Sequence, residues 1–336
     1  MNRLYLLNRR SLFLSQNLFG SPIRVRCNST RQYNVLFFGT DQVSVKTLEQ
    51  LRINQTGRDN RPKVIGHLEV LTPQNQTDIA VVVSYGHLIP NHVLDLFPLN
   101  GINMHPSLLP KYRGAAPVYH ALLNNDHQTG ISVIELSRGK FDVGKILHQS
   151  EHSIHPHDTF TSLRDRLAES GSHAIMDVLC HLEEKRRQAR DQKDMPHVAS
   201  YAGKINRSMG YIDWNRHTAE DVYRIWRALG DTVGVHCLFA YNGNQVKLSQ
   251  VCPPDTKISY KNVEKFEGQY EPGMIKYDIQ QEIVFVRCRG GWVGVSQFHV
   301  ENHRTSTAKE FALGYHFSGV KMPESRYRFL SINQTL

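Results

Sequence analysis

A run of five apolar residues, Ile79–Val83, most constrains what this 336-residue chain can fold into. A strand with apolar side chains on both faces needs cover on both faces, which is the pattern of a buried parallel strand. A second, mostly apolar run over 33–38 ends in Gly39-Thr40, and helical spacing follows over 43–51. Strands that alternate with helices in this way predict an α/β fold.

The same alternation continues along the first 195 residues. We expect further strands at 67–71, 101–104, 132–136 and 146–149, and helices at 87–97 and 158–182. The helix at 158–182 is amphipathic, because its apolar residues from Phe160 to Leu182 fall on one stripe. These elements predict a doubly wound, largely parallel sheet over residues 33–195.

The pattern changes in the C-terminal part of the chain. Residues 196–214 have the composition of a linker, and Thr218-x-x-Asp221 then opens a helix as a capping box that Gly230 ends. After this helix, short apolar strands flank Asn242-Gly243 and Gly290-Gly291, which are strong hairpin signals. Several short strands with tight turns predict a small β-barrel within residues 215–336.

The segment Asn103–Pro117 holds the strongest candidate site. Asn103 and His105 are two residues apart at the end of a short strand, so their side chains share one face. Pro117 suits the first position of a following helix. Open α/β sheets build ligand sites at the carboxyl ends of strands, although these two residues alone would equally fit a capped strand with a chance histidine.

This segment resembles the signature of folate-dependent formyltransferases, Asn-x-His-x-Ser-Leu-Leu-Pro followed by Tyr-Arg-Gly-Ala-Ala-Pro. A matching acid lies in Phe141-Asp142-Val143-Gly144, so the resemblance implies a catalytic triad of Asn103, His105 and Asp142. Segments 36–42, 200–205 and 212–214 are similar to the branch of the family that formylates methionyl-tRNA. The resemblance runs from about residue 34 to about residue 329, and it implies a Rossmann-like catalytic domain followed by a barrel of the oligonucleotide-binding (OB) type.

Formyl transfer to an amine is acyl transfer through a tetrahedral intermediate. The Asn103 amide is a suitable donor to the oxyanion, and the His105 imidazole is a natural proton acceptor near neutral pH. Asp142 can orient the imidazole, stabilise its charge, or hold a water that relays its proton; spacing leaves these roles open. Ser107 is interpreted as a turn residue, because it lacks the flanking small residues of a nucleophile elbow.

The family implies 10-formyltetrahydrofolate as the formyl donor and co-substrate. Its flat pterin ring needs an apolar slot with a few hydrogen-bonding groups. The resemblance assigns that slot to the loop 135–142 and to the following residues: His87, Leu88, Ile89, Ser107, Leu108, Leu109 and Pro110. Leu88 and Ile89 would equally fit the core side of a helix.

The resemblance also implies methionyl initiator tRNA as the formyl acceptor. Candidate phosphate contacts are Lys111, Arg113, Lys204, Arg207, Arg287 and Arg289. Each of them is individually better explained as an ordinary surface charge, and the charged run 185–193 is predicted to be a solvated helix end, with a phosphate contact as the alternative. Phosphate contacts give affinity and salt dependence rather than sequence choice.

The net charge of +9 is concentrated near the N-terminus. Residues 1–32 hold six arginines and no acid or lysine, so subtracting them leaves +3 on the remainder. A leader rich in Arg, Ser and Leu, with no acid before Asp41, is typical of a mitochondrial transit peptide, whereas Asn8-Arg9-Arg10 interrupts the apolar core that a secretory signal needs. We therefore expect a mitochondrial matrix protein.

Other site classes find little support in the sequence. No apolar run approaches the ~20 residues that span a membrane, so we expect no membrane insertion. Five scattered cysteines without a C-x-x-C favour a reduced protein without a metal. The closest histidine cluster, His152, His155 and His157, lacks a cysteine or acid at metal-site spacing, and we expect a monomer.

One segment departs from the family pattern. Only residues 72–78 separate the strand that ends at Leu71 from the strand that begins at Ile79, where the family places a basic loop, a helix and a strand. A parallel crossover normally takes at least about 10–12 residues. We therefore expect that one β-α unit is missing, through splicing or a faulty gene model. We expect the strand at 67–71 to be strained, displaced or unpaired while the strands that carry the triad survive.

The resemblance thus implies formyl transfer from 10-formyltetrahydrofolate to the α-amino group of methionyl initiator tRNA, in mitochondrial translation initiation. Two alternatives stay open. One is a formyltransferase that uses the same triad on a small amine. The other is a catalytically impaired RNA-binding isoform, because of the missing unit.

Overall fold

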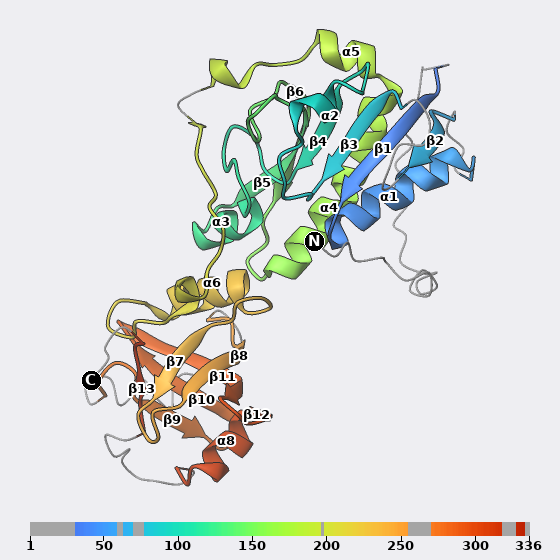
Figure 1. Cartoon of the computed structure of the whole chain (residues 1–336). Coiled ribbons are helices and arrows are strands. Elements are labelled where there is room, and N and C mark those ends of the chain that lie inside the picture. The colour runs from blue at the N-terminus through green and yellow to red at the C-terminus, as the bar shows by residue number, and fades with distance from the viewer. Residues whose placement is uncertain are drawn as a thin grey trace.

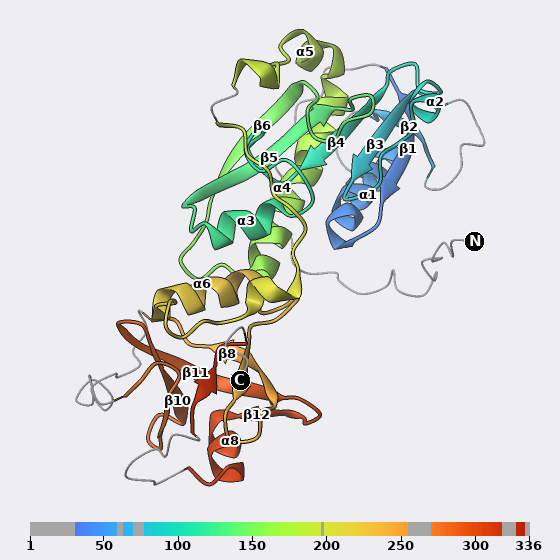
Figure 2. The same ribbon diagram turned by 60° about the vertical axis from the view of Figure 1, so that its left-hand side comes forward.

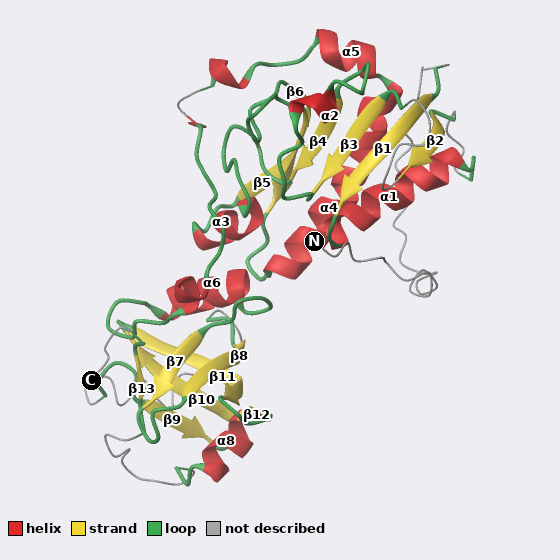
Figure 3. Cartoon of the chain, viewed as in Figure 1, coloured by secondary structure: helices red, strands yellow, loops and turns green. Residues whose placement is uncertain are grey.

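The computed structural model describes residues 31–58, 63–69, 77–195, 198–254, 270–317 and 327–332. Figure 1 shows two parts: an α/β part with a central sheet, and a β-rich part that follows a long linker. The predicted leader, residues 1–32, lies almost wholly outside the described residues. Figure 3 shows helices and strands together in one part and mainly strands in the other, as the change in sequence pattern predicts.

The α/β part is built on a six-stranded sheet in the order β2-β1-β3-β4-β5-β6. Its strands are β1 (Tyr33–Gly39), β2 (Ile65–Glu69), β3 (Ile79–Val83), β4 (Gly101–His105), β5 (Gln128–Glu135) and β6 (Ile146–Ser153). The first four strands in this order are parallel. β5 and β6 are antiparallel to their neighbours, so the predicted α/β sheet is parallel only in its first four strands.

Two long helices cover one face of this sheet. α1 (Gln42–Gln55) and α4 (Phe160–Cys180) lie side by side in Figures 1 and 2. The apolar stripe predicted for α4 is confirmed, because Leu163, Leu167 and Ile175 are buried. α4 begins with a capping box at Thr159.

The short helices differ more from the sequence prediction. α2 covers only Asn91–Leu94, so the helix predicted over 87–97 is wrong for most of its length. Pro90 starts it in an extended conformation, and a proline there disfavours helix in the residue before it. The other short helices are α3 (Pro117–Leu123), which Pro117 opens as predicted, α5 (Leu182–Arg187) and the 3₁₀ turn η1 (Gln192–Asp194).

The strand next to the shortened segment is paired. β2 runs parallel to β1, with Asn34 opposite His67 and Leu36 opposite Glu69. Of the three expected outcomes for this strand, the unpaired one is therefore wrong, whereas strain and displacement stay predictions. The strand begins at Ile65, two residues before the predicted start. Residues 70–76 lie outside the described residues, so the missing β-α unit stays a prediction.

The second part is a barrel with the strand order β13-β7-β8-β11-β10-β9, in which β12 pairs with β11. A bridge between Met274 and Arg328 connects the two ends of this order and closes the barrel. Both predicted hairpins are confirmed, with antiparallel β7–β8 and β10–β11. The strands are β7 (His236–Phe239), β8 (Gln245–Val251), β9 (Ile275–Asp278), β10 (Ile283–Cys288), β11 (Gly291–Val300), β12 (Thr305–Thr307) and β13 (Phe329–Leu330).

Helices cover the barrel and join it to the sheet. α6 (Ala219–Leu229) begins with the predicted capping box, Thr218 with Asp221, and ends at Gly230. Figures 1 and 2 show α6 between α3 and the barrel, and α8 (Ala308–Gly314) at the far end. Val118 and Leu163 of the first part share one apolar cluster with barrel residues, so the two parts are packed on each other rather than merely tethered.

Candidate active site

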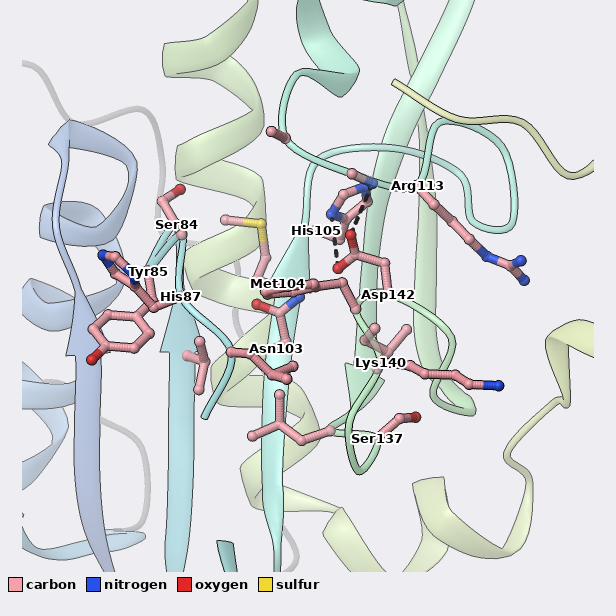
Figure 4. A pocket seen from close by; sticks show the side chains of 18 of the residues that line it. Ser84, Tyr85, His87, Asn103, Met104, His105, Arg113, Ser137, Lys140 and Asp142 are labelled. Atoms are coloured by element: carbon pink, nitrogen blue, oxygen red, sulfur yellow. Dashed lines mark hydrogen bonds and ion pairs between the residues drawn. The ribbon is translucent and has the colours of Figure 1, made fainter. Parts of the chain in front are cut away.

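The end of β4 places Asn103 and His105 on the wall of a cavity of about 610 Å³. His105 is only 5% exposed. In Figure 4, Asn103 lies between two groups of side chains: Ser84, Tyr85 and His87 on one side, and His105, Asp142, Arg113 and Lys140 on the other. Both residues line the same cavity wall, which is consistent with the prediction that their side chains share one face of the strand.

The His105 imidazole has a partner at each nitrogen. Its Nε2 lies 2.8 Å from the Tyr112 carbonyl oxygen, and its Nδ1 lies 3.5 Å from Oδ1 of Asp142. Because a carbonyl oxygen can only accept, Nε2 carries a proton and donates it to this bond. Nδ1 is therefore the nitrogen that is available to take up a proton, beside a carboxylate that is itself largely shielded from solvent.

A glycine fixes the other oxygen of Asp142. The backbone N–H of Gly114 donates to Oδ2 at 2.9 Å. Gly114 has φ +110°, and a Cβ on it would lie 2.7 Å from the Tyr201 ring and 2.8 Å from the Ala202 carbonyl oxygen. Both the backbone conformation and the close approach require glycine here, so this part of the motif serves the geometry of the acid.

Gln192 is a buried residue of the site that the sequence analysis missed. Its Nε2 donates to the carbonyl oxygens of Asp142 (3.0 Å) and Gly144 (2.8 Å), and its Oε1 accepts from Nε and NH2 of Arg113 (3.0 and 2.8 Å). Only 2% of the residue is exposed. The prediction that the run 185–193 is a solvated helix end is therefore wrong at this position, and the local sequence does not distinguish Gln192 from Gln188, which is exposed.

The rest of that run is also more anchored than a solvated helix end. Lys185 forms an ion pair of 2.7 Å with Asp177 on α4, and Arg186 forms one of 3.1 Å with Glu135 at the end of β5. The hydrogen bond from His148, together with those from Lys185, lowers the pKa of Asp177 despite its burial. These contacts fix α5 against the sheet and so fix the chain that leads to Gln192.

One end of the cavity is apolar and aromatic. Leu88 and Ile89 both line it, and neither is in a helix, so the alternative that they are helix-core residues does not hold. The Tyr85 ring packs edge-on against Phe38 at 5.3 Å and against His87 at 5.6 Å between ring centroids. This end offers apolar surface and ring faces to a flat ligand.

The turn after His105 supports the cavity from behind. Ser107 is fully buried and donates through Oγ to the Lys111 carbonyl oxygen at 2.6 Å, while the Leu109 N–H donates to Ser132 Oγ at 3.0 Å. This confirms Ser107 as a turn residue. Four residues predicted to contact folate lie off the cavity wall, because the turn folds inward after Pro106: Ser107, Leu108, Leu109 and Pro110.

The loop that leads to the acid lies where it was predicted. Residues of the segment 135–142 that line the cavity are Glu135, Leu136, Ser137, Lys140, Phe141 and Asp142. Asp142 itself has φ +55°, a conformation in which Asp is among the tolerated residues. This loop joins the antiparallel pair β5–β6, so the hairpin positions the acid opposite β4.

The six basic residues predicted to contact phosphate are spread over the molecule. Arg113 and Lys204 line the cavity, whereas Lys111 lies off the cavity wall and forms an ion pair of 2.7 Å with Asp126. Arg207 of the linker donates to Gln245 of the barrel at 2.6 Å, and the Arg287 guanidinium lies 5.7 Å from the centroid of the Trp292 ring. Arg289 is exposed at the Gly290 turn.

The described residues give no support for a metal or membrane site. No group of three or more His, Cys, Asp or Glu side chains among them could hold a metal ion. His152 has Ser170 Oγ at 2.9 Å and His157 has the Tyr223 hydroxyl at 3.2 Å, so the histidine cluster is divided between separate partners. None of the helices in the described ranges combines the length and apolarity of a membrane span.

Comparison with known proteins accounts for this geometry. Residues 24–179 match the family described as formyl transferase, and residues 204–316 match formyl transferase, C-terminal domain. The chain is 31% identical over 313 residues to the protein named Methionyl-tRNA formyltransferase, mitochondrial, of Homo sapiens, which covers 84% of this chain and 78% of the human protein. This chain belongs to the methionyl-tRNA formyltransferase family. It is therefore a formyl-transferring enzyme, and the resemblance seen in the sequence is confirmed.

A bacterial relative agrees with this assignment, and two solved structures share the fold. Methionyl-tRNA formyltransferase of Halothermothrix orenii is 31% identical over 265 residues, 79% of each chain. HypX from Aquifex aeolicus in complex with tetrahydrofolic acid has the same fold, with a TM-score of 0.60 at 16% identity over 86% of this chain. The alignment spans about half of HypX, 48% of its length. The sugar 3N-formyl transferase WlaRD aligns over 82% of this chain and all of its own, with a TM-score of 0.55 at 15% identity.

Proposed function

We propose that this enzyme transfers the formyl group of 10-formyltetrahydrofolate to the α-amino group of methionyl initiator tRNA for translation initiation in mitochondria. The observation that carries the proposal is that Asn103, His105 and Asp142 line one cavity, in a chain whose relatives are named methionyl-tRNA formyltransferase. A formyltransferase for small amines is less favoured, because the relatives that match through the barrel are named for methionyl-tRNA.

The cavity fits the folate. Its volume, about 610 Å³, lies within the usual range for small-molecule sites, and Val82, Ile89 and Leu94 give it apolar walls. The aromatic end with Tyr85 and His87 suits a flat pterin ring. When bound, the folate supplies a formyl group that is already activated for acyl transfer.

Asn103 is placed to donate a hydrogen bond to the oxygen of that formyl group. Its carboxamide is held by strand β4 and faces the cavity between the aromatic end and the His105 side (Figure 4). The amide N–H donates to the oxygen as negative charge develops there. Because the strand fixes the donor before the reaction, the interaction needs no reorganisation, and removing such a donor typically costs about 10²–10³ in rate.

His105 acts as the general base for the attacking amine. The Tyr112 carbonyl holds the proton on Nε2, so Nδ1 accepts the proton that the amine loses. Asp142, 3.5 Å away and held by Gly114, stabilises the resulting imidazolium. This distance is too short for a water between the two groups, so the geometry favours an orienting and charge-stabilising role for Asp142 over a water relay between them.

The mitochondrial location rests on the leader and on the relatives. Residues 1–32 have the composition of a transit peptide, and several relatives are named as mitochondrial forms, although bacterial relatives are also similar. Removing residues 1–32 from a reporter fusion of the full chain should abolish its import into mitochondria. Continued import would place the signal elsewhere.

A formylation assay with labelled 10-formyltetrahydrofolate and methionyl-tRNA tests the function directly. The wild-type chain should formylate methionyl-tRNA, and His105→Ala should lower the rate by about 10²–10⁴ through loss of the general base. Thermal unfolding of the variant checks that the fold is kept. Transfer to small amines without transfer to methionyl-tRNA would support the rival enzyme, and binding of tRNA without any transfer would support the impaired isoform.

A further inference from the structure

Tyr201 is an aromatic residue that the fold holds in solvent at the cavity wall. It is 73% exposed and lies on the linker between the two parts. Its neighbours are fixed: the Arg113 N–H donates to the Ser200 carbonyl at 2.9 Å, and the Ala202 N–H donates to the Arg113 carbonyl at 2.7 Å. The linker is therefore paired with the loop after β4 at this point, and the ring has a defined place although little packs on it.

The Gly114 backbone lies between the Tyr201 ring and the catalytic pair, His105 and Asp142. A Cβ built on Gly114 would lie 2.7 Å from Cε2 of Tyr201, and the Gly114 N–H is the donor to Asp142. The Tyr201 ring thus lies against the backbone that holds the acid. A flat group stacked on it would be close to the site where His105 takes up a proton.

The charges around this end of the cavity favour an anionic substrate. Arg113, Lys140 and Lys204 line the cavity together with Tyr201. The acids that also line it have partners of their own: Asp41 caps α1, Glu135 pairs with Arg186, and Asp142 accepts from the Gly114 N–H. In Figure 4, Arg113 and Lys140 lie on the opposite side of Asn103 from Tyr85 and His87. The cavity therefore has an aromatic, apolar end and a cationic end, and Tyr201 is joined through Arg113 to the cationic end.

We propose that Tyr201 is a positioning residue that stacks on the terminal nucleobase of the aminoacyl-tRNA, with Lys204 close to the adjoining phosphate. This inference rests on the proposed function. The reacting amine belongs to an amino acid esterified to the terminal ribose, so only the ester and that ribose separate the amine from the terminal base. Aromatic rings bind single-stranded bases by stacking, and a cation beside them binds the backbone.

Kinetics of Tyr201→Ala and Tyr201→Phe test the proposal. Stacking acts on the bound substrate and on the transition state alike, so Tyr201→Ala should raise KM for methionyl-tRNA by about 5- to 150-fold with kcat changed little. KM for 10-formyltetrahydrofolate should stay the same, and Tyr201→Phe, which keeps the ring face, should behave like the wild type. Leu96→Ala, at a 59% exposed position of the same part, is the matched control for loss of exposed apolar surface.

A modified acceptor identifies the group that stacks. A methionyl-tRNA whose terminal residue lacks its base should lose the same factor with the wild type, and Tyr201→Ala should then add no further loss. Additive losses would overturn the proposal, as would an unchanged KM for methionyl-tRNA or a raised KM for the folate in Tyr201→Ala. The proposal would also fail if Phe141→Ala, at another exposed aromatic residue of the described cavity wall, and not Tyr201→Ala, cancelled the effect of removing the terminal base.

The formylation assay distinguishes failure of the stacking proposal from failure of the proposed function. If the wild type fails to formylate methionyl-tRNA at all, the proposed function fails and the stacking proposal fails with it. If the wild type is active and Tyr201→Ala is equally active at low methionyl-tRNA concentration, only the stacking proposal fails.

Discussion

Asp158→Asn tests the contact network that joins α4 to the barrel. Only 6% of the Asp158 side chain is exposed, and it accepts hydrogen bonds from NH1 and NH2 of Arg166 (3.0 and 2.6 Å), from the His155 N–H (2.8 Å) and from Ser162 Oγ (3.0 Å). NH1 of Arg227, on α6, donates to the Asp158 carbonyl oxygen at 3.2 Å. The carboxylate therefore shapes the loop on which α6 docks.

The expected magnitude follows from the pKa of the carboxyl group. Burial raises the pKa of Asp158, but the hydrogen bonds from Arg166, His155 and Ser162 lower it by a larger amount. The net result is a pKa lowered from 3.8 to about 2. A group with a depressed pKa adds stability above its unfolded value, and this stability is lost as the pH falls through the folded value. The difference between 3.8 and 2 corresponds to about 2 kcal/mol at neutral pH.

Urea unfolding of wild type and Asp158→Asn at several pH values measures this contribution. The difference in unfolding free energy should be about 2 kcal/mol at pH 7, about half of that at pH 3, and small near pH 2. Asp165→Asn is the matched control, because that carboxylate pairs with Arg164 on the same helix but is 58% exposed. A difference that is the same at pH 7 and pH 3 would refute the reasoning, because it would not depend on the charge of Asp158.

Three further predictions concern the site and the barrel. Asp142→Asn should lower the transfer rate by about 10² and alter the pH–rate profile, and an unchanged profile would argue against coupling to His105. Gln192→Ala should lower kcat without unfolding the protein, because loss of the Gln192 side chain frees the loop that holds Asp142. A folded variant with the wild-type kcat would contradict this role of Gln192. Arg289→Ala should reduce the salt slope of tRNA binding by about one, whereas Arg304→Ala, whose side chain is 86% exposed elsewhere on the barrel and pairs with Glu310, should leave it unchanged. Equal slopes for both variants would remove Arg289 from the tRNA contacts.

Local features could be predicted well from the sequence. The shared wall position of Asn103 and His105 follows from strand alternation, and the capping box at Thr218 and both glycine turns depend on residues within a few positions of one another. The same holds for Pro117 at the start of α3. Such features form because neighbouring residues alone satisfy the backbone, and distant packing does not change them.

Only the tertiary structure determines which distant segments of the chain contact one another. Nothing near Gln192 in the sequence indicates that it holds Arg113 and the Asp142 loop, because these partners are 79 and 50 residues away. The turn after Pro106 folds inward because Leu109 donates to Ser132 across 23 residues, which removed four expected residues from the cavity wall. Tyr201 lies against Gly114 only because the linker pairs with Arg113. The residue types of the site are determined locally, whereas their places depend on long-range hydrogen bonds and packing that periodicity does not encode.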